Sequence, residues 1–484
     1  MNKRIYIIGA GFAGQTLALE IRKKAVFGQV AAFLDDDVEK IGRVIDGAPV
    51  LGPVESAAQA LSPLSGDEAI IAMPSTTQDY QGKLYAILRG AGFQKIRILP
   101  AISQIIQGDA HLIQTRAIDP QDLLGRAPVP INLKESLAYL RGKRVLITGA
   151  GGSIGSELCR QLLSGGAERL YLFGHGENAI YQIDRELRLL QEEGVGERAS
   201  IVPVIGDLKD APYINFLLSR LNADVVFHAA AYKHVPLMEE NPVAAVQNNL
   251  FGAENLLKAA QAHGVKRFVH ITTDKAVEPR SVYGMSKYLC ERLVAETAST
   301  AESGAFMAVR FGNVLGSRGS IIPLFEKQIA KGGPVTVTHP DMKRWFMSIP
   351  EACSLTLKVG GVGENGRLYL LDMGDPVKIR DVAEQMIRFY GFEPDKDVKI
   401  VYTGVRPGEK LDEKLVSSDE KTLETGFNRI LRVEKITPPT EDACAFREWI
   451  ERLRPICYFD EHQSAAYRDA ALLRETLHDM FNGV

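Results

Sequence analysis

Two stretches of the chain begin alike, and this similarity constrains the fold more than any other feature. Residues 3–14 read KRIYIIGAGFAG, and residues 143–155 read KRVLITGAGGSIG. In each stretch a short β-branched apolar run leads into closely spaced glycines and then into a helix-like segment. A strand buried on both faces, a glycine turn and a helix open the βαβ unit that binds dinucleotides. The sequence therefore predicts an α/β fold with two doubly wound, parallel-sheet domains of the Rossmann type.

The apolar runs that follow extend this alternation along the chain. We expect a first domain over residues 1–118 and a proline-containing linker over residues 119–142. The second domain is expected over residues 143–440. Its substrate-binding part should begin after about residue 320, since late segments of such sheets fold over the carboxyl ends of the strands. Residues 441–484 are expected to form a helical tail that serves packing or oligomerisation.

Composition excludes several classes of protein. The 57 basic and 60 acidic side chains leave a net charge of −3, which gives no global electrostatic reason to bind nucleic acid. The five cysteines form no CxxC pair and predict a reduced, cytoplasmic protein without disulfides or a cysteine zinc site. We expect no metal. We also expect no membrane span, because no apolar run reaches 18 residues, and no signal peptide, because the N-terminal apolar stretch runs straight into the glycine cluster.

The second glycine cluster has the form TGxxGxxG and predicts a cofactor-binding loop. Gly149 permits the tight turn, Gly152 lets backbone amides approach a pyrophosphate, and Gly155 allows close packing of helix on strand. The N-terminus of the following helix then faces the negative charge. The residues expected to line the cofactor are Thr148, Gly149, Gly152, Ser153, Ile154, Gly155, His175, Asp207, Leu208, Ala229, Ala230, Tyr283 and Lys287.

The carboxylate that commonly binds the ribose of NAD is missing. After RLYLF the chain reads Gly174-His175-Gly176-Glu177, where an acidic residue often ends the strand. The glycine leaves room for a 2′-phosphate that His175 could touch, and Glu177 could instead replace the missing ribose ligand. Asp207, after another apolar run, could hold the adenine amino group. The choice between NAD and NADP therefore stays open.

The first glycine cluster, Gly9, Gly11 and Gly14, has the GxGxxG form, and Asp35 follows at the end of the next apolar run. This arrangement is competent to bind a nucleotide. A domain kept for assembly or regulation fits these residues equally well, because no catalytic group follows the loop.

The segment HITTDKAVEPRSVYGMSKYLCERL, residues 270–293, carries the groups for chemistry. Tyr283 and Lys287 are four residues apart and would share one face of a helix. A tyrosine pKa lies near 10, and a neighbouring ammonium and a cationic nicotinamide ring would lower it. The phenolate could then take a hydroxyl proton while hydride leaves for the cofactor. With the TGxxGxxG loop, this YxxxK pair is typical of short-chain dehydrogenase/reductases.

A second set of groups precedes that helix. Thr273, Asp274 and Lys275 end an apolar run, at the edge where this architecture places catalytic side chains. An acid and a base there exceed what simple oxidation needs. They suit an elimination, in which one group removes a carbon-bound proton and the other protonates a departing hydroxyl. A surface ion pair is the alternative interpretation.

Several blocks of the chain resemble one family. They read VAAFLDDD, DLLGRAPVPINL, HAAAYKHVPLMEENPVAAVQNNLFGAENLL, TTDKAVEPRSVYGMSK, RFGNVLGSRGSIIPLFEKQI, VTVTHPDMKRWFMSIPEA and TGVRPGEKLDEKL. Over almost the whole chain they resemble the bacterial polysaccharide-biosynthesis nucleotide-sugar 4,6-dehydratases, which are extended short-chain dehydrogenase/reductases typified by UDP-N-acetylglucosamine 4,6-dehydratase. Long-form relatives carry transmembrane helices before the first domain, so this chain is expected to correspond to their soluble core. Many have Met where this chain has Tyr283, which favours the ordinary tyrosine role here.

The resemblance implies a reaction on UDP-N-acetylglucosamine or a close UDP-sugar, for surface polysaccharide or glycan synthesis. The C4 hydroxyl is oxidised, water is lost across C5 and C6, and hydride returns to C6 to give a 4-keto-6-deoxy sugar. NAD or NADP would stay tightly bound and be recycled. The resemblance also implies a homo-oligomer. A UDP-sugar 4-epimerase of the same superfamily and a non-catalytic cofactor-binding regulator are the alternatives.

By position, the resemblance assigns a role to each candidate residue. Tyr283 and Lys287 match the oxidation pair, and Thr273 matches the residue that orients the hydroxyl. Asp274 matches the acid for the C6 hydroxyl, and Lys275 matches the base for C5. Positions that match substrate contacts are Lys233, Asn313, Arg318, Arg406 and Glu409, of which the arginines suit a diphosphate and Glu409 suits ribose hydroxyls.

Overall fold

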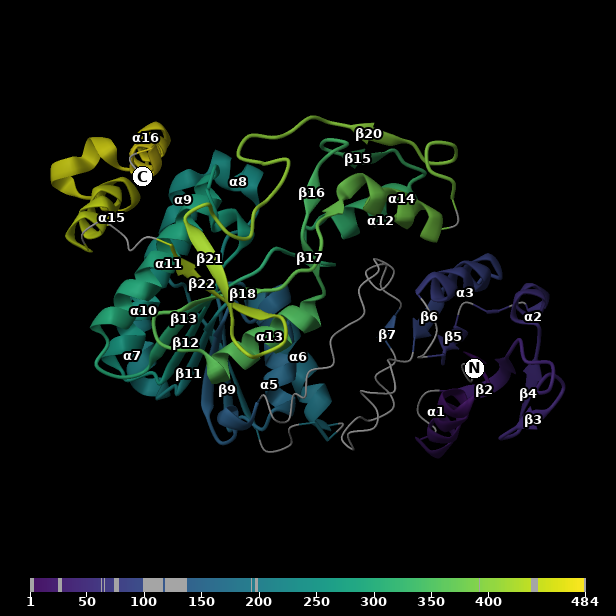
Figure 1. Ribbon diagram of the computed structural model, residues 1–484. Helices are drawn as coiled ribbons and strands as arrows, with labels where there is room; N and C mark the ends of the chain where they lie inside the picture. Colours follow the sequence, from purple (N-terminus) through teal and green to yellow (C-terminus); the bar gives the residue numbers. More distant parts are fainter. Residues whose placement is uncertain are drawn as a thin grey trace. The chain divides into compact units, whose positions relative to one another are not determined.

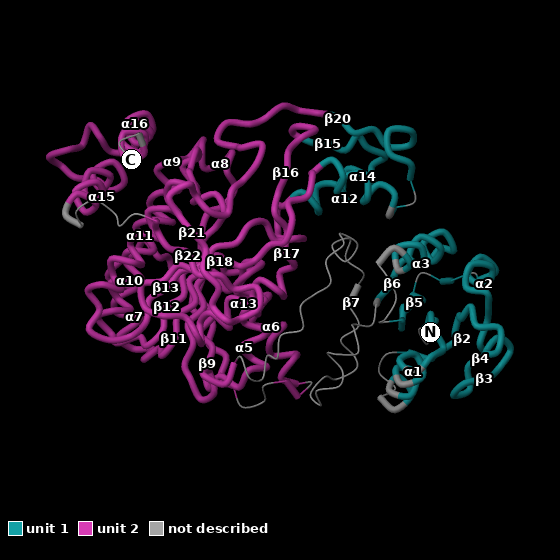
Figure 2. Tube along the Cα trace, in the orientation of Figure 1, with its two compact units in different colours: residues 1–130, 321–337, 380–401 teal, residues 131–320, 338–379, 402–484 magenta. Residues whose placement is uncertain are grey.

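The structure is a computed structural model that divides into two compact units. It describes residues 4–24, 28–61, 63–64, 66–73, 78–98, 116–117, 137–192, 194–195, 199–390, 392–436 and 443–482. Unit 1 comprises residues 1–130, 321–337 and 380–401, and unit 2 comprises residues 131–320, 338–379 and 402–484 (Figure 2). Most of the expected linker lies outside the described residues, so the expected domain boundaries stay predictions.

Unit 1 contains a seven-stranded sheet in the order β3-β4-β2-β1-β5-β6-β7. The strands β4, β2, β1, β5 and β6 are parallel, with β3 and β7 antiparallel at the edges. The first apolar run forms β1, whose last four residues are buried, as a strand covered on both faces requires. The elements are β1 Arg4–Ile8, α1 Phe12–Lys24, β2 Gln29–Leu34, β3 Val44–Ile45, β4 Ala48–Leu51, α2 Val54–Ala60, β5 Glu68–Ile71, α3 Gln78–Gly90, β6 Lys95–Ile98 and β7 Arg116–Ala117.

Unit 2 contains a nine-stranded sheet in the order β10-β9-β8-β11-β12-β13-β18-β22-β21. Figure 1 shows this sheet, with β9, β11, β12 and β13 among its labelled strands. The strands from β10 to β18 are parallel, and β22 and β21 extend the sheet as an antiparallel pair. The strands are β8 Arg144–Thr148, β9 Arg169–Gly174, β10 Ser200–Ile205, β11 Val225–His228, β12 Arg267–Ile271, β13 Ala305–Arg310, β18 Leu368–Leu371, β21 Glu420–Glu424 and β22 Ile430–Lys435. The predicted α/β class with two Rossmann-like sheets is therefore confirmed.

Helices cover both faces of the unit 2 sheet, and each face has its own apolar core. On β8, Leu146 enters one core, while its neighbours Val145 and Ile147 enter the other. This alternation is the period of a strand, and burial on both faces explains why the predicted runs are apolar throughout. The helices are α5 Ser153–Ser164, α6 Glu177–Glu192 and α13 Ile349–Val362 on one face, and α7 Ala211–Leu221, α10 Gly252–Ala262 and α11 Val282–Thr300 on the other.

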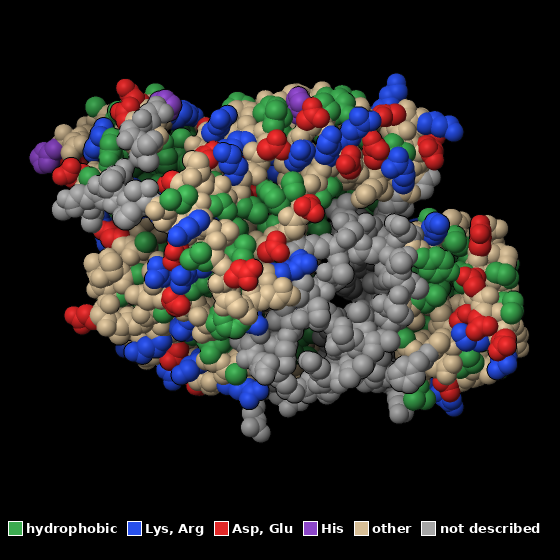
Figure 3. Space-filling view, in the orientation of Figure 1, with side chains coloured by type: hydrophobic (Ala, Val, Ile, Leu, Met, Phe, Trp, Pro, Cys, Tyr) green, Lys and Arg blue, Asp and Glu red, His purple; other side chains and the backbone are tan. Residues whose placement is uncertain are grey.

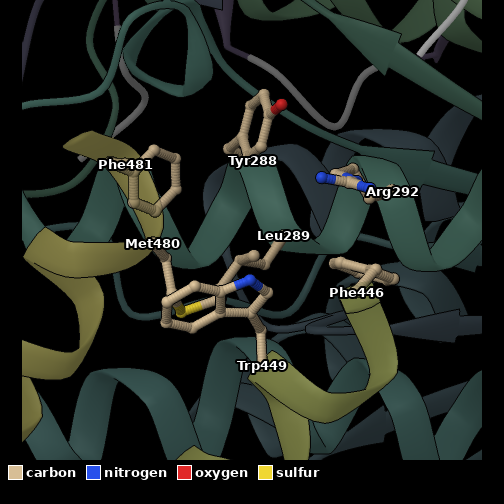
Figure 4. Close-up of a pocket in the computed structure, with 7 residues that line it drawn as sticks. All are labelled: Tyr288, Leu289, Arg292, Phe446, Trp449, Met480 and Phe481. Atoms are coloured by element: carbon tan, nitrogen blue, oxygen red, sulfur yellow. The ribbon is translucent and has the colours of Figure 1, made fainter. Parts of the chain in front are cut away.

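The tail is helical, as its charged and apolar pattern predicts, and it packs on the core that contains α11. Leu453 and Leu473 are fully buried in that core. A cavity of about 30 Å³ remains between α11 and the tail, room for little more than a water molecule (Figure 4). It is lined by Tyr288, Leu289, Arg292, Phe446, Trp449, Met480 and Phe481. The tail elements are α15 Ala443–Cys457, η6 Glu461–Ala466 and α16 Ala470–Asn482.

The remaining elements are short or follow residue 320. They are η3 Ala138–Leu140, α8 Val235–Glu240, α9 Pro242–Val246, η4 Gln247–Phe251, η5 Asp274–Ala276, β14 Asn313–Val314, α12 Ile321–Ala330, β15 Val335–Val337, β16 Lys343–Arg344, β17 Phe346–Met347, β19 Val377–Lys378, α14 Ile379–Phe389 and β20 Ile400–Tyr402. No helix in the described part of the chain is long and apolar enough to cross a membrane. Acidic and basic side chains are interspersed on the visible face of Figure 3, in keeping with the small net charge.

Candidate active site

The candidate site lies at the carboxyl ends of the central parallel strands of unit 2. The strand order reverses between β8 and β11, which is where open α/β sheets bind ligands. Thr148 ends β8, His228 ends β11, and residues 273–275 follow β12. The groups predicted for cofactor binding and the groups predicted for chemistry therefore share one edge of one sheet.

The glycine loop between β8 and α5 is compact, because two of its positions have no room for a side chain. Gly149 has a φ of +67°, and a Cβ there would lie 2.8 Å from the backbone of Ala230. A Cβ at Gly155 would lie 2.1 Å from the carbonyl oxygen of Gly149. This packing brings the N-terminus of α5 up to the end of β8, which is the arrangement that binds a pyrophosphate.

Tyr283 and Lys287 lie in the first two turns of α11. Ser281 caps this helix, since its Oγ accepts a hydrogen bond from the N–H of Gly284 at 3.1 Å. A Cβ at Gly284 would lie 2.3 Å from the carbonyl oxygen of Lys275, so α11 packs directly against η5. Only 7% of Tyr283 and 3% of Lys287 are exposed. The fold thus brings the predicted oxidation pair next to the predicted elimination pair.

Burial dominates the electrostatics of Tyr283 and Lys287. The Lys287 Nζ donates to the carbonyl oxygen of Ile271 at 2.7 Å and is 2.9 Å from Nε2 of His270. Burial lowers the pKa of Lys287. Burial also raises the pKa of Tyr283, whereas its hydrogen bond with Thr273 lowers it and the charge of Asp274 raises it further. The phenolate therefore needs additional positive charge nearby to form at neutral pH.

Asp274 and the partly exposed Lys275 form an ion pair. The Lys275 Nζ donates to Asp274 Oδ1 at 2.9 Å and to Asn313 Oδ1 at 3.1 Å. Asp274 is fully buried, and its other oxygen, Oδ2, has no hydrogen-bond partner. Thr273 Oγ1 also donates to Asp274 Oδ1, at 3.0 Å. Because this buried carboxylate oxygen has no partner among the described residues, Asp274 can still bond to a further group.

The candidate substrate residues fall into three places. Lys233 and Asn313 lie by Lys275: Asn313 accepts its hydrogen bond, and burial, followed by the charge of Lys275, lowers the pKa of Lys233. Arg318 instead contacts the glycine loop, where its Nη1 donates to the carbonyl oxygen of Gly151 at 2.9 Å. Arg406 and Glu409 form an ion pair with each other.

The family model described as "Polysaccharide biosynthesis protein" matches residues 145–435, more than half of the chain. The chain belongs to this family. The match covers all nine strands of the unit 2 sheet except the first residue of β8, and it includes both candidate catalytic pairs.

Curated proteins are also similar to this chain, and their names state different activities. The probable polysaccharide biosynthesis protein EpsC of Bacillus subtilis is 42% identical over 430 residues, which cover 89% of this chain and 71% of that protein. A UDP-N-acetylglucosamine 4,6-dehydratase (inverting) of Campylobacter jejuni is 32% identical over 289 residues, covering 59% of this chain and 81% of the relative. A UDP-glucose 4-epimerase of Rickettsia bellii is 34% identical over 301 residues, covering 60% and 82%.

Among solved structures, Pen from Bacillus thuringiensis resembles this member of the family. It has a TM-score of 0.56 and a sequence identity of 33%, and the match covers 61% of this chain and 90% of Pen. The shared part is thus close to the size of the family match, and the fold of unit 2 is one found in experimental structures.

The other residues predicted for the cofactor lie near the loop but have protein partners. Thr148 Oγ1 lies 2.7 Å from His228 Nδ1 and accepts from the N–H of Ala230 at 3.4 Å. Asp207 pairs with Lys209 at 3.2 Å. The ring of His175 stands edge-on to the ring of Tyr232, with centroids 6.1 Å apart. These contacts leave the choice of NAD or NADP undecided.

In unit 1, Asp35 holds its own glycine loop. Its Oδ2 accepts from the N–H of Ala10 at 2.6 Å, and its Oδ1 accepts from the N–H of Asp37 at 2.9 Å. A Cβ at Gly14 would lie 2.0 Å from the carbonyl oxygen of Gly9, so helix and strand pack closely. Nucleotide binding there stays a prediction, with Asp35 already engaged in supporting the loop.

Three polar residues of the site were missed from sequence. Glu413 is 7% exposed, and its carboxylate lies 3.9 Å from Lys275 and 3.5 Å from Lys410. Asn249 accepts from the N–H of Tyr232 at 2.8 Å and donates to Ser286 Oγ at 3.2 Å. His270, the third, contacts Lys287. Glu413 and His270 stand inside quoted motifs, which was the available signal, but spacing alone does not reveal what they face.

No cluster suited to a metal ion occurs among the residues that the structure describes.

Proposed function

We propose that this protein is a nucleotide-sugar 4,6-dehydratase. Its substrate would be UDP-N-acetylglucosamine or a close UDP-N-acetylhexosamine, and its product would be the 4-keto-6-deoxy sugar nucleotide for a surface polysaccharide or glycan. The observation that carries this proposal is the Asp274–Lys275 ion pair, 2.9 Å apart, whose carboxylate is fully buried and which packs against the helix of Tyr283 and Lys287. A site for oxidation alone has no use for a second acid and base. The name of the Campylobacter relative supports the same reaction.

The loop around Gly149 fits NAD or NADP, because the absence of a Cβ at Gly149 and Gly155 allows the tight turn that brings the N-terminus of α5 up to the strand end, where a pyrophosphate binds. We propose that this loop, with Thr148 and Lys287, holds the cofactor tightly. When bound, it would accept hydride from C4 of the sugar and return it to C6. The residues of the chain then supply binding, orientation and proton transfer.

Tyr283 is proposed to take the proton of the C4 hydroxyl. The cationic nicotinamide ring would supply the positive charge that its phenolate needs against the effect of burial. Thr273 is hydrogen-bonded to both Tyr283 and Asp274. Thr273 therefore links Tyr283, which gains the first proton, to Asp274, which must donate a proton later. At the end of a turnover, the proton on Tyr283 can pass through Thr273 to Asp274.

Asp274 and Lys275 are proposed to perform the elimination together. Transfer of one proton along their 2.9 Å hydrogen bond converts the ion pair into a carboxylic acid and a free amine. The amine of Lys275 then removes the C5 proton, and the acid protonates the C6 hydroxyl, which leaves as water. This restores the ion pair, and the Lys275 ammonium can return a proton to C5 when hydride reaches C6.

The proposal is tested by incubating the purified protein with UDP-N-acetylglucosamine and no added cofactor. Formation of the 4-keto-6-deoxy product, detected by mass spectrometry and NMR, would support the substrate, the reaction and the retained cofactor together. An epimer at C4 would instead support the 4-epimerase that the Rickettsia relative suggests, in which Asp274 and Lys275 have no chemical role. Binding without turnover of any UDP-sugar would favour a regulator.

We also propose that the protein acts as a homo-oligomer in the cytoplasm. The resemblance to dehydratases supports an assembly, and the mass in solution measures it. A monomer at micromolar concentration would refute this part of the proposal without affecting the reaction.

A further inference from the structure

A row of buried polar side chains crosses the unit 2 sheet beneath the candidate site. In the strand register Thr148 pairs with His228, and His228 pairs with His270. Residues in register on neighbouring strands project to the same face. The row is continuous, since Thr148 Oγ1 lies 2.7 Å from His228 Nδ1, and the two imidazole centroids are 5.0 Å apart. All three residues are at most 1% exposed.

Lys287 meets the end of this row. Its Nζ lies 2.9 Å from Nε2 of His270 and donates to the carbonyl oxygen of Ile271. An ammonium group carries only donors, so Nε2 accepts and the imidazole proton lies on Nδ1. Burial, followed by the charge of Lys287, keeps the pKa of His270 well below its usual value, which leaves the ring neutral. Two of the three Nζ hydrogens are thus held, and one remains for the site.

From this geometry we infer that His270 is a positioning residue, whose imidazole holds the Lys287 ammonium in place for the reaction. The inference rests on the proposed function, because it adds a residue to the oxidation machinery. His270 touches neither substrate nor cofactor in this account and acts only through Lys287.

The other groups that face Lys287 cannot replace this acceptor. His228 faces it from β11, while Cys290 and Glu291 belong to its own helix. Glu291 is already occupied by Arg310, 2.7 Å away, and by Thr272. Among the hydrogen bonds of the described residues, His270 is the one side chain that accepts from Lys287 Nζ. Without it, a buried ammonium would keep a single carbonyl partner, and its charged form would be less stable.

The test is to titrate Lys287 directly, by NMR of protein labelled with [ε-¹³C]lysine, with the signal assigned from Lys287→Arg. His270→Leu removes the acceptor, and the titration midpoint should fall by about one pH unit or more. His270→Gln keeps an oxygen near the place of Nε2 and should restore most of the midpoint. His228→Gln is the matched control: it lies equally deep in the row without touching Lys287, and should leave the midpoint unchanged. Should leucine prevent folding, His270→Met fills a similar space without a strong acceptor and carries the same expectation.

An unchanged midpoint in a folded His270→Leu or His270→Met protein would overturn the inference, as would an equal shift in His228→Gln. The titration needs neither substrate nor cofactor, so its result does not depend on whether the proposed function is correct. In turnover, the alkaline limb of the pH profile should move to lower pH in His270→Leu by the same amount, since the protonated Lys287 is the working form. A uniform loss of rate with the limb in place would indicate a merely structural role.

Discussion

At the scale of single residues, the site depends on charges that are buried with their partners. Asp274 has no exposure to water, and Lys275 is its ion-pair partner at 2.9 Å. A buried pair of this kind adds little net stability, and removal of one member is costly because the other is left unpaired. Such a pair is better explained by chemistry than by folding.

The first prediction separates the two halves of the reaction. Asp274→Asn keeps the shape of the side chain but cannot supply a proton, so turnover should fall by about 10²- to 10⁴-fold. Oxidation at C4 should continue, and reduced cofactor should accumulate in single-turnover absorbance measurements. Asp341→Asn, an exposed aspartate paired with Lys378 at 3.8 Å, is the control and should change neither quantity. Normal turnover in Asp274→Asn would remove Asp274 from the elimination.

The second prediction concerns how the buried His228 changes the stability of the protein at acidic pH. Burial lowers the pKa of His228 to about 3, whereas the unfolded chain has an ordinary histidine pKa near 6.5. The unfolded state therefore binds more protons between these values, and this histidine's contribution to stability is lost as pH falls through that range. The expected loss is up to about 1.4 kcal/mol per pH unit.

Urea unfolding at neutral pH and at about pH 5 measures this effect, since an ordinary histidine is largely protonated at the lower value. The wild-type protein should lose more stability between these conditions than His228→Gln, which has no titrating ring at that position. Equal losses in the two proteins would show that His228 is readily protonated in the folded state.

At the scale of elements, close backbone contacts at glycines position the candidate catalytic groups. The loop between β8 and α5 closes only because a Cβ is absent at Gly149 and Gly155. The contact between η5 and α11 similarly requires Gly284. These close approaches bring the end of β8 against the start of α5, and η5 against the start of α11.

The third prediction tests this packing. Gly155→Ala places a Cβ 2.1 Å from the carbonyl oxygen of Gly149, so the loop must shift. We expect a loss of about 1–3 kcal/mol in stability, together with loss of cofactor from the purified protein. Gly90→Ala, where a Cβ would meet no atom within 4 Å, should change neither quantity. Full retention of cofactor by Gly155→Ala would contradict the role given to this loop.

Sequence predicted these elements well where structure is local. The run RLYLFG forms β9, and both glycine turns stand between a strand and a helix, because burial on two faces and a tight turn each leave a local pattern. It did not predict β22 and β21, which extend the sheet from the region expected to form the substrate-binding part. Nor could it place Glu413 by Lys275 or His270 by Lys287, since such contacts depend on which distant segments meet.

At the scale of the whole molecule, the two Rossmann-like units differ in the polar groups that accompany their glycine loops. In unit 1 the acidic residue after β2 is engaged by the loop itself, through Ala10. In unit 2 the candidate catalytic groups follow the strand next to the loop's own sheet neighbours, and Asp274, Tyr283 and Lys287 among them are buried. The chemistry proposed here therefore rests on unit 2, and the ligand of unit 1 stays a prediction.

The central claim is that one site removes hydride from C4 of a sugar and returns the same hydride to C6. The direct test uses UDP-N-acetylglucosamine with deuterium at C4, incubated with the purified protein, and NMR of the product. The account predicts a 4-keto-6-deoxy sugar with deuterium on the C6 methyl group. Deuterium retained at C4 of an epimer, or a C6 methyl group that carries only protium, would contradict it.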